Sequence, residues 1–377
     1  MYTLAGCRVC GSNMTTLLEY ENMPKAAQNF PSLEDLNHEK GEYLEVCQCM
    51  ACGLVQLGNE PVDYYKEVIR ASAFSEEMRQ FRVAQFKDFV ERYSLQNKNV
   101  VEVGCGKGEF LELMRDAGTN AYGLEYSNES VRFCKDKGLD VFETYIEKLS
   151  DVLPKHPTDC FFIMNFFEHL PDPNTTLRVL YSNLSDDGIG IVEVPNFDMI
   201  VKNNLFSEFI NDHLFYFTKE TLKSVLERNG FEVVECNEVW HDYIISVVVK
   251  KRKLLDLSNF DKHQQKIKKE IQSYISMYDP GEVAIYGAGH QALAVMALAD
   301  MRDKVKYVVD DATFKQGKYT PATHVPIVSS NSIKNNPPKA IIVMAASYSD
   351  EVVGKMLKNH EGIKLAVLRD FGLEIIV

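Results

Sequence analysis

Short apolar runs alternate with amphipathic segments between residues 76 and 250, and this alternation constrains the fold more than any other feature. The runs NVVEVGCG, NAYGLEY, DCFFIMNF and IGIVEVPN are strand-like, whereas EFLELMRDAG and NESVRFCKDKG have helical periodicity. Alternating strands and helices are typical of a parallel sheet covered by helices on both faces. Two β-rich runs, FEVVECNEV and YIISVVVKK, close the zone and can pair antiparallel. We therefore predict an α/β domain over residues 76–250.

The residues before and after this core differ from it in composition and in the pattern of apolar runs. A chain of 377 residues is long enough for about two or three domains. Residues 1–75 are cysteine-rich and irregular, and we expect a small separate domain there. Residues 251–377 contain further strand-like runs, EVAIYGAG, KVKYVVDD, KAIIVMAA and LAVLRDFG, which predict a second, smaller α/β domain. The charged stretch 251–278 is interpreted as a solvated connecting helix.

Composition excludes several classes of partner. Lys plus Arg number 41 and Asp plus Glu 54, a formal charge of −13, which disfavours binding to a nucleic-acid backbone. The apolar tracts are too short to span a membrane, and the start MYTLAGCRVC lacks the basic and apolar stretches of a secretory signal. We expect a cytoplasmic protein that acts on a small molecule, without nucleic acid or membrane as partner. The oligomeric state is left open, with a monomer as the default expectation.

Two CxxC pairs stand near the N-terminus, and we interpret them as a metal site. Cys7 and Cys10 form the first pair, and Cys49 and Cys52 form the second. Four thiolates from two such turns can bind tetrahedral zinc, and an all-sulfur site is structural, not catalytic. Cys47 is a spare ligand that can compete with Cys49. The alternatives are buried free thiols or, more remotely, a redox pair.

A glycine turn follows the first strand of the core in the sequence VVEVGCGKGEF. Gly104, Gly106 and Gly108 let the backbone approach a ligand closely, and a helix begins after them. Glu102 precedes the turn, and Glu125 ends the next apolar run, where a carboxylate can bind ribose hydroxyls. Two carboxylates near the turn suit an amine and a ribose but repel a pyrophosphate. The glycine spacing is GxGxG, whereas a dinucleotide-binding turn has GxGxxG. These features favour S-adenosylmethionine over a dinucleotide or a ligand-free scaffold.

This stretch resembles motif I of class I methyltransferases. The later segment FIMNFFEHLPDP is similar to the one that follows the fourth strand of those enzymes and borders the methyl group. The resemblance implies that Asn165 and His169 line the cofactor pocket, although His169 can equally be a structural histidine bonded to a loop. It also places Glu147 near the adenine.

Over nearly the whole chain, the order of parts resembles the zinc-containing sugar C-methyltransferases that act on nucleotide-linked 4-keto deoxysugars. Members of that family open with a CxxC…CxxCGL domain, matched here by CRVCG and CMACGLVQL. They end in a second Rossmann-like domain, whose YGA motif and KQGRYxPGTHIPI-like segment are matched by YGAGHQ and KQGKYTPATHVPI. The resemblance implies a class I core between two flanking domains, with S-adenosylmethionine and structural zinc.

In that family a Tyr-His-Glu-His segment carries catalysis, and its last His is the base. The matching positions here are Ile210, Asn211, Asp212 and His213, and the family's YFS is matched by Tyr216-Phe217-Thr218. The resemblance therefore implies His213 as base, assisted by Asp212, with Asn196 and Tyr216 near the substrate. A structural alternative is that the Asp-His pair only caps a loop.

The departures from the family segment bear on the acceptor atom. Methylation at carbon needs a base to remove a proton next to a ketone, and an imidazole suits that task. A phenol beside the developing oxyanion would stabilise it, but Ile210 cannot donate a hydrogen bond. The missing donor favours O- or N-methylation, because those reactions need a base but no group to stabilise an oxyanion. C-methylation remains the leading interpretation, ahead of a non-catalytic sugar-nucleotide-binding protein and an oxidoreductase.

The C-terminal domain offers candidate contacts to a nucleotide-linked sugar. In YGAGHQ, a strand is followed by a glycine turn and a helix, a pattern that is generic by itself. The resemblance implies that Tyr286, His290 and Lys315 bind substrate. A lysine can pair with a diphosphate as a point charge, and the alternative is an ordinary surface lysine.

Overall fold

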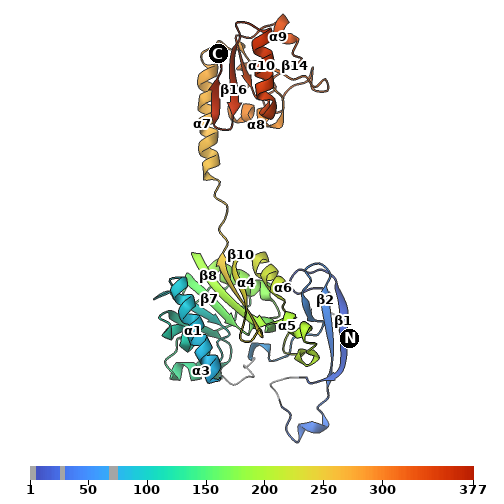
Figure 1. The fold of residues 1–377 in the computed structure, drawn as a ribbon, viewed down its shortest axis with the longest axis vertical. Coiled ribbons are helices and arrows are strands. Elements are labelled where there is room, and N and C mark those ends of the chain that lie inside the picture. The colour runs from blue at the N-terminus through green and yellow to red at the C-terminus, as the bar shows by residue number, and fades with distance from the viewer. Residues whose placement is uncertain (1–5, 26–29, 68–74) are drawn as a thin grey trace. The chain divides into compact units, whose positions relative to one another are not determined.

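The computed structural model describes residues 6–25, 30–67 and 75–377. These residues form two compact units, 1–253 and 254–377, which are described separately (Figure 1).

The first unit contains a seven-stranded sheet, as the class I resemblance implies. The strand order is β10-β11-β8-β7-β4-β5-β6. Strands β4 to β8 pair in parallel, and β11 pairs antiparallel with both β10 and β8. The expected antiparallel pairing of FEVVECNEV and YIISVVVKK is therefore confirmed. The strands are β4 (Asn99–Val103), β5 (Asn120–Glu125), β6 (Val141–Glu143), β7 (Thr158–Met164), β8 (Leu184–Pro195), β10 (Phe231–Val239) and β11 (Ile244–Lys251).

Helices cover both faces of this sheet (Figure 1). One core contains apolar side chains of α1 (Glu76–Arg92), α2 (Glu109–Asp116) and α3 (Asn128–Asp136). The core on the other face contains side chains of α4 (Pro173–Asn183) and α6 (Lys219–Arg228). Side chains alternate along β4, so that Val100 faces the first core and Val101 the second. This layering is the class I methyltransferase fold.

A second, four-stranded sheet of the first unit carries the cysteine pairs. Its order is β1-β2-β3-β9, with strands β1 (Met14–Met23), β2 (Glu42–Cys49), β3 (Val55–Leu57) and β9 (Phe215–Tyr216). Strand β9 belongs to the candidate catalytic segment, so pairing of β3 with β9 fixes that segment to the N-terminal sheet. Helix α5 (Phe197–Lys202) and the short turns η1 (Asp35–Asn37), η2 (Tyr65–Glu67), η3 (Phe167–His169) and η4 (Phe206–Glu208) complete the unit. The boundaries at residues 75 and 250 remain predictions.

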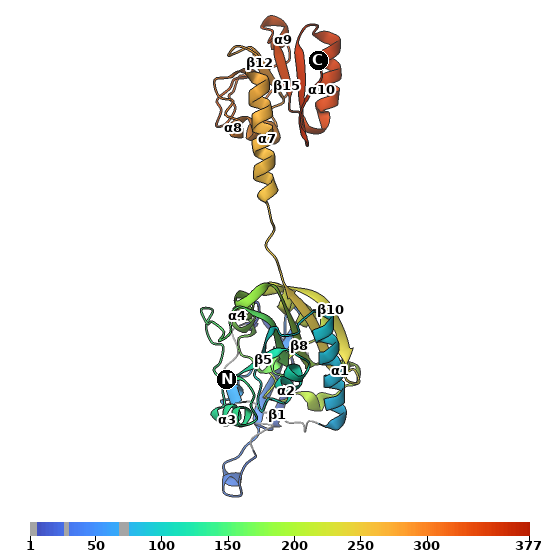
Figure 2. The ribbon, with the colours of Figure 1, turned by 90° about the vertical axis from the view of Figure 1, so that its left-hand side faces the viewer.

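The second unit is a six-stranded sheet between two helical layers (Figure 2). Helices α7 (Ser258–Ile275) and α8 (His290–Leu298) pack on one face, and α9 (Ser332–Asn335) and α10 (Ser349–Asn359) on the other. The sheet order is β14-β13-β12-β15-β16-β17, and turn η5 (Ala346–Tyr348) precedes α10. The strands are β12 (Val283–Tyr286), β13 (Val305–Val309), β14 (Ile327–Val328), β15 (Ala340–Val343), β16 (Lys364–Arg369) and β17 (Gly372–Ile375).

Helix α7 corrects the interpretation of residues 251–278 as a solvated connector. Its last turns bury Ile271, Tyr274 and Ile275 in the core of the second unit. The charged residues of the helix lie on its remaining surface, so its overall composition concealed an apolar stripe.

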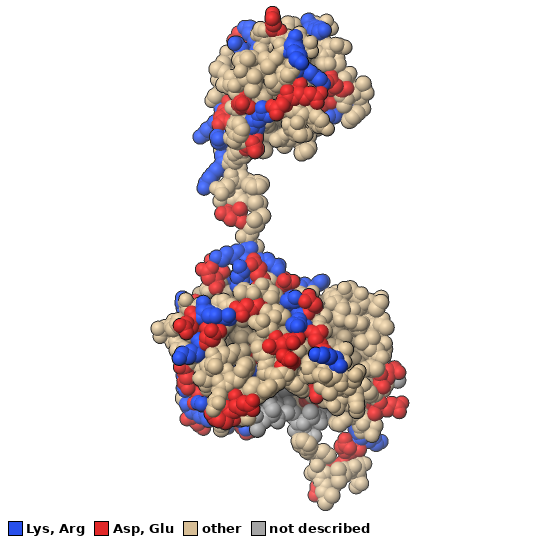
Figure 3. All heavy atoms as spheres, viewed as in Figure 1, with Lys and Arg blue, Asp and Glu red and all other residues tan. Residues whose placement is uncertain are grey.

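Charges of both signs are interspersed on the visible surface (Figure 3). Among the described residues, the helices all fall short of the length and apolar character needed to cross a bilayer.

Candidate active site and metal centre

The four predicted zinc ligands lie together. The sulfur atoms of Cys7, Cys10, Cys49 and Cys52 are all within 4.8 Å of one another. Cys7 Sγ lies 3.7 Å from Cys52 Sγ, and Cys10 Sγ lies 3.4 Å from Cys49 Sγ. A tetrahedron of sulfurs at a zinc–sulfur distance of about 2.3 Å has edges of about 3.8 Å, so the donor set fits zinc.

Backbone amides complete both cysteine turns. The amide of Val9 donates to Cys7 Sγ, and the amides of Ala51 and Cys52 donate to Cys49 Sγ, each at 3.4 Å. Such donors stabilise negative charge on sulfur. The spare residue Cys47 is buried on β2 and lies outside the group of four.

The glycine turn has the geometry that its sequence predicts. Gly104, Gly106 and Gly108 have φ angles of +69°, +54° and +78°, and Gly108 is the N-cap of α2. A Cβ atom on Gly104 would lie 2.5 Å from the Phe166 ring, whereas one on Gly106 would meet nothing within 4 Å. Gly104 is therefore required by packing, and the Gly106 backbone is open to a ligand.

Glu125 stands at the end of β5 and is held by the turn itself. Its carboxylate accepts hydrogen bonds from the amides of Gly106 and Ser127, each at 2.8 Å. Glu102 is almost fully buried on the neighbouring strand β4. The two predicted carboxylates thus flank the same turn, as the carboxyl ends of adjacent parallel strands require.

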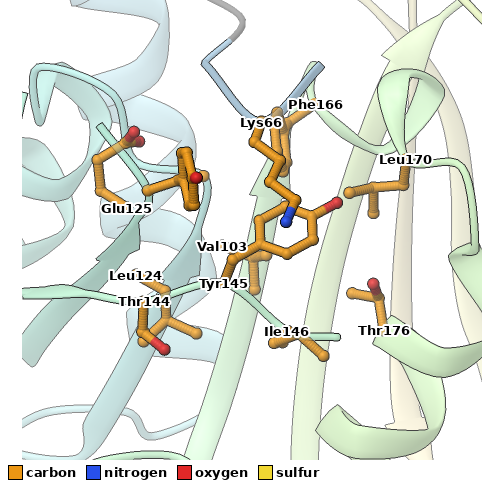
Figure 4. A pocket seen from close by; sticks show the side chains of 12 residues that line it. Lys66, Val103, Leu124, Glu125, Thr144, Tyr145, Ile146, Phe166, Leu170 and Thr176 are labelled. Atoms are coloured by element: carbon orange, nitrogen blue, oxygen red, sulfur yellow. The ribbon is translucent and has the colours of Figure 1, made fainter. Parts of the chain in front are cut away.

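A small pocket opens at the ends of β4 and β5. Figure 4 shows the Lys66 side chain extending into it, with its ammonium nitrogen over the ring of Tyr145. The lining residues are Lys66, Val103, Gly104, Leu124, Glu125, Tyr126, Thr144, Tyr145, Ile146, Phe166, Leu170 and Thr176.

The other three predicted cofactor residues occupy different environments. Asn165 follows β7 in a left-handed conformation with φ of +51°, and its amide donates to the Glu193 carbonyl. Glu147 lies exposed in the loop after β6 and forms an ion pair with Lys66. His169 is buried, and it belongs to the cluster described next.

His169, Asp212 and His213 form a compact cluster, in which His169 and Asp212 are buried and His213 is half-buried. His169 Nδ1 lies 2.6 Å from the Asp212 carbonyl oxygen, to which it donates when Nδ1 is protonated. The rings of His169 and His213 meet edge to face, with centroids 4.7 Å apart. Burial lowers the pKa of His169 to about 4. Burial and then the neighbouring His169 lower the pKa of His213 well below its usual value. Both imidazoles are therefore neutral near pH 7, the state required of a base.

A phenol that sequence reasoning missed reaches this cluster. The hydroxyl of Tyr64 donates a 2.6 Å hydrogen bond to the Asp212 carboxylate. The two residues are far apart in the sequence, so no local motif could have identified the contact. The position matched to the family's tyrosine, Ile210, contributes its backbone instead, because its amide donates to the Tyr216 hydroxyl at 2.9 Å.

Asn196 and Tyr216, the predicted substrate residues of this unit, both have structural contacts. Asn196 is the N-cap of α5, accepts from the Met199 amide, and donates to the Asp242 carbonyl at 2.7 Å. Tyr216 is buried, and its hydroxyl is bonded to the backbone of residue 210. Tyr216 therefore positions the segment that carries Asp212, whereas a contact of either residue to substrate stays a prediction.

Two of the three predicted substrate residues of the second unit contact an acidic pair. Lys315 Nζ donates to Asp310 Oδ2 at 2.8 Å, and the Tyr286 hydroxyl donates to Asp311 Oδ2 at 2.9 Å. His290 is exposed at the start of α8. Asp310 follows the second strand after a glycine turn, as Glu125 does in the first unit. That shared position is a sequence signal that we overlooked.

The fold and the glycine–carboxylate site of the first unit define a class I methyltransferase domain, and comparisons with known proteins agree. Residues 76–236 match the family described as methyltransferase domain, and residues 249–367 match the C-methyltransferase C-terminal domain. The chain is 24% identical to C-methyltransferase NovU of Streptomyces niveus over 386 aligned residues, covering 92% of this chain and 91% of that protein. The chain is an S-adenosylmethionine-dependent methyltransferase. It combines a methyltransferase domain with a domain that matches the C-methyltransferase C-terminal domain.

Shorter similarities cover parts of the core. A ubiquinone biosynthesis O-methyltransferase of Pseudomonas entomophila (strain L48) is 30% identical over 104 residues, which are 26% of this chain and 44% of that protein. The solved structure of the PH0226 protein from Pyrococcus horikoshii OT3 matches with a TM-score of 0.41 and 15% identity, covering 50% of this chain and 99% of that one.

Proposed function

We propose that this enzyme methylates a carbon next to a keto group of a nucleotide-linked sugar, with His213 as the base. The observation that carries the proposal is the neutral His213 imidazole packed edge to face against the buried His169 ring, in a chain that resembles a C-methyltransferase along nearly its full length. The same resemblance supports cytoplasmic biosynthesis and a small-molecule acceptor.

The chemistry assigns a task to each residue of the cluster. When bound, S-adenosylmethionine would supply an electrophilic methyl group and be left as the neutral thioether. His213 takes the proton from the acceptor carbon, and the electron pair of that C–H bond becomes the nucleophile. The Asp212 carboxylate stabilises the imidazolium that results. His169 holds the Asp212 backbone in place.

Tyr64 fills the role that Ile210 cannot. Its phenol donates to the Asp212 carboxylate in the structure, and in this proposal the hydroxyl turns to the keto oxygen when substrate binds and stabilises the oxyanion that develops there. One such donor contributes about 3 kcal/mol to an acyl-transfer enzyme, so its presence favours the carbon acceptor.

We further propose that Cys7, Cys10, Cys49 and Cys52 hold a structural zinc ion. The compact set of four sulfurs supports this. The ion would join the two ends of the β1–β2–β3 region and hold the sheet that supports β9. In the first unit, Asn196 and Tyr216 are proposed sugar contacts. In the second unit, taken by itself, Tyr286, His290 and Lys315 are proposed contacts to a nucleotide.

O- or N-methylation of a sugar remains the second candidate, because Ile210 stands where the family has a tyrosine. Carbon NMR of the product made from a nucleotide-linked 4-keto deoxysugar separates the candidates. A methyl carbon bonded to carbon supports the proposal. A methyl bonded to oxygen or nitrogen overturns it, as does failure to methylate any 4-keto sugar nucleotide.

A further inference from the structure

A cation occupies the pocket that the cofactor requires. Lys66 lies on turn η2, and its ammonium nitrogen is 5.0 Å from the ring centroid of Tyr145, 5.1 Å from that of Tyr126 and 5.8 Å from that of Tyr65. The same nitrogen forms an ion pair with Glu147. An ammonium held between aromatic faces and a carboxylate is in a favourable site for a cation.

The tyrosines form an ordered cage around it. Tyr145 packs edge to face against both Tyr65 and Tyr126, with centroid distances of 6.2 and 6.3 Å. Such pairs add stability beyond the area they bury. Tyr126 directly follows Glu125, and Tyr145 belongs to the loop after β6, so the cage stands over the carboxyl ends of the strands that bear the glycine turn.

The contacts of Lys66 conflict with a bound cofactor. Lys66, Tyr126 and Tyr145 line the same pocket as Gly104 and Glu125, and the Lys66 side chain extends through it (Figure 4). S-adenosylmethionine carries a sulfonium, so a second cation in the pocket repels it as well as taking up space.

We propose that Lys66 and Glu147 form a latch that closes the cofactor pocket and must open before S-adenosylmethionine binds. The inference rests on the proposed function, with S-adenosylmethionine bound in the pocket that Gly104 and Glu125 line. The segment that carries Lys66 stays attached to the core when the latch opens, because the Tyr64 hydroxyl still donates to Asp212. The ion pair is only partly exposed on the Lys66 side, with 23% of that side chain accessible, so its strength depends on salt but is not negligible.

The test is the rate at which S-adenosylhomocysteine binds to the full-length chain, followed by stopped-flow fluorescence. Lys66→Met keeps the length of the side chain and removes its charge. We expect the association rate constant to rise about three- to tenfold, the range set by one ion pair with cation–π contacts. Glu147→Gln should give the same gain, and the double variant no more than either single variant.

Salt provides a second readout. Raising ionic strength should speed association with the wild-type chain, because it weakens the latch, and should leave Lys66→Met unaffected.

Lys155→Met is the matched control, since Lys155 pairs with Asp140 and lies 5.4 Å from the Tyr122 ring. An unchanged or slower association for Lys66→Met overturns the latch. Absence of wild-type binding would instead overturn the cofactor pocket.

Discussion

The hydroxyl of Tyr64 donates a hydrogen bond of 2.6 Å to the carboxylate of Asp212, joining residues 148 positions apart. Tyr64 follows the N-terminal sheet, whereas Asp212 precedes β9, which completes that same sheet. The end of the N-terminal region therefore brings a phenol to the carboxylate that precedes the candidate base His213, and the site depends on both halves of the first unit.

Replacing Tyr64 tests whether this phenol acts on the reaction. Tyr64→Phe should lower kcat about 10- to 100-fold by removing one oxyanion donor, while the affinity for S-adenosylhomocysteine stays unchanged. Tyr43→Phe is the control, because Tyr43 makes a similar 2.5 Å hydrogen bond to Glu19 on the exposed N-terminal sheet. Equal effects of the two substitutions on kcat would show that Tyr64 is merely structural.

His213 should be indispensable as a base. His213→Gln should lower kcat/KM by about 100-fold or more, with cofactor affinity retained, whereas the exposed His241→Gln should have no effect. Because burial lowers the pKa of His213, the wild-type acidic limb should fall below pH 6.5. An acidic limb at or above that pH would count against His213 as the titrating base.

Glu125 should bind the cofactor through its carboxylate. Glu125→Gln removes a charge that accepts two backbone hydrogen bonds, and a lost charged hydrogen bond costs about 1.5–3 kcal/mol. The Kd for S-adenosylhomocysteine should therefore rise about 10- to 100-fold in calorimetry. Glu143→Gln, on the next strand and bonded to Asn128, should change it little. Indistinguishable Kd values for the two variants would remove the assignment.

The two kinds of cysteine in β2 distinguish a zinc site from buried thiols. Cys49→Ser should abolish zinc binding and lower the melting temperature, because metal binding contributes to folding. Cys47→Ser should retain one zinc per chain, since Cys47 lies outside the cluster. Metal analysis of both purified variants shows which cysteine binds zinc. Loss of zinc from the Cys47 variant alone would make Cys47, and not Cys49, the ligand.

His169 should make stability depend on pH. The pKa of His169 is about 4 in the folded chain, below its unfolded value of about 6.5. The unfolded state therefore binds more protons, and unfolding free energy should fall by up to about 1.4 kcal/mol per pH unit as pH drops from about 6.5 to 4. Denaturant titrations should show a smaller decrease for His169→Asn. Identical pH slopes would exclude this contribution.

Features set by short segments of sequence were predictable. The strand at 99–103, the glycine turn and Glu125 follow from periodicity and from the backbone freedom of glycine. The spacing of the two CxxC turns predicted that their four sulfurs would lie together, as they do. The carboxyl ends of adjacent strands then bring Glu102 and Glu125 to one turn without further information.

Contacts made by irregular segments were not predictable in the same way. Tyr64 and Lys66 lie on a short turn whose path depends on the folded sheet and core together, and neither side chain belongs to a recognisable pattern. Lys315 illustrates a related difficulty: its sequence shows a basic residue suited to a diphosphate, but Asp310 already accepts a hydrogen bond from it.

Exchange of the acceptor's proton with solvent deuterium tests the central claim most directly. The full-length enzyme is incubated in D₂O with S-adenosylhomocysteine and a nucleotide-linked 4-keto deoxysugar, and deuterium next to the keto group is followed by NMR. We predict exchange by the wild-type chain and its loss in His213→Gln. Methylation of that sugar by a wild-type enzyme that exchanges no proton would contradict carbanion formation by His213.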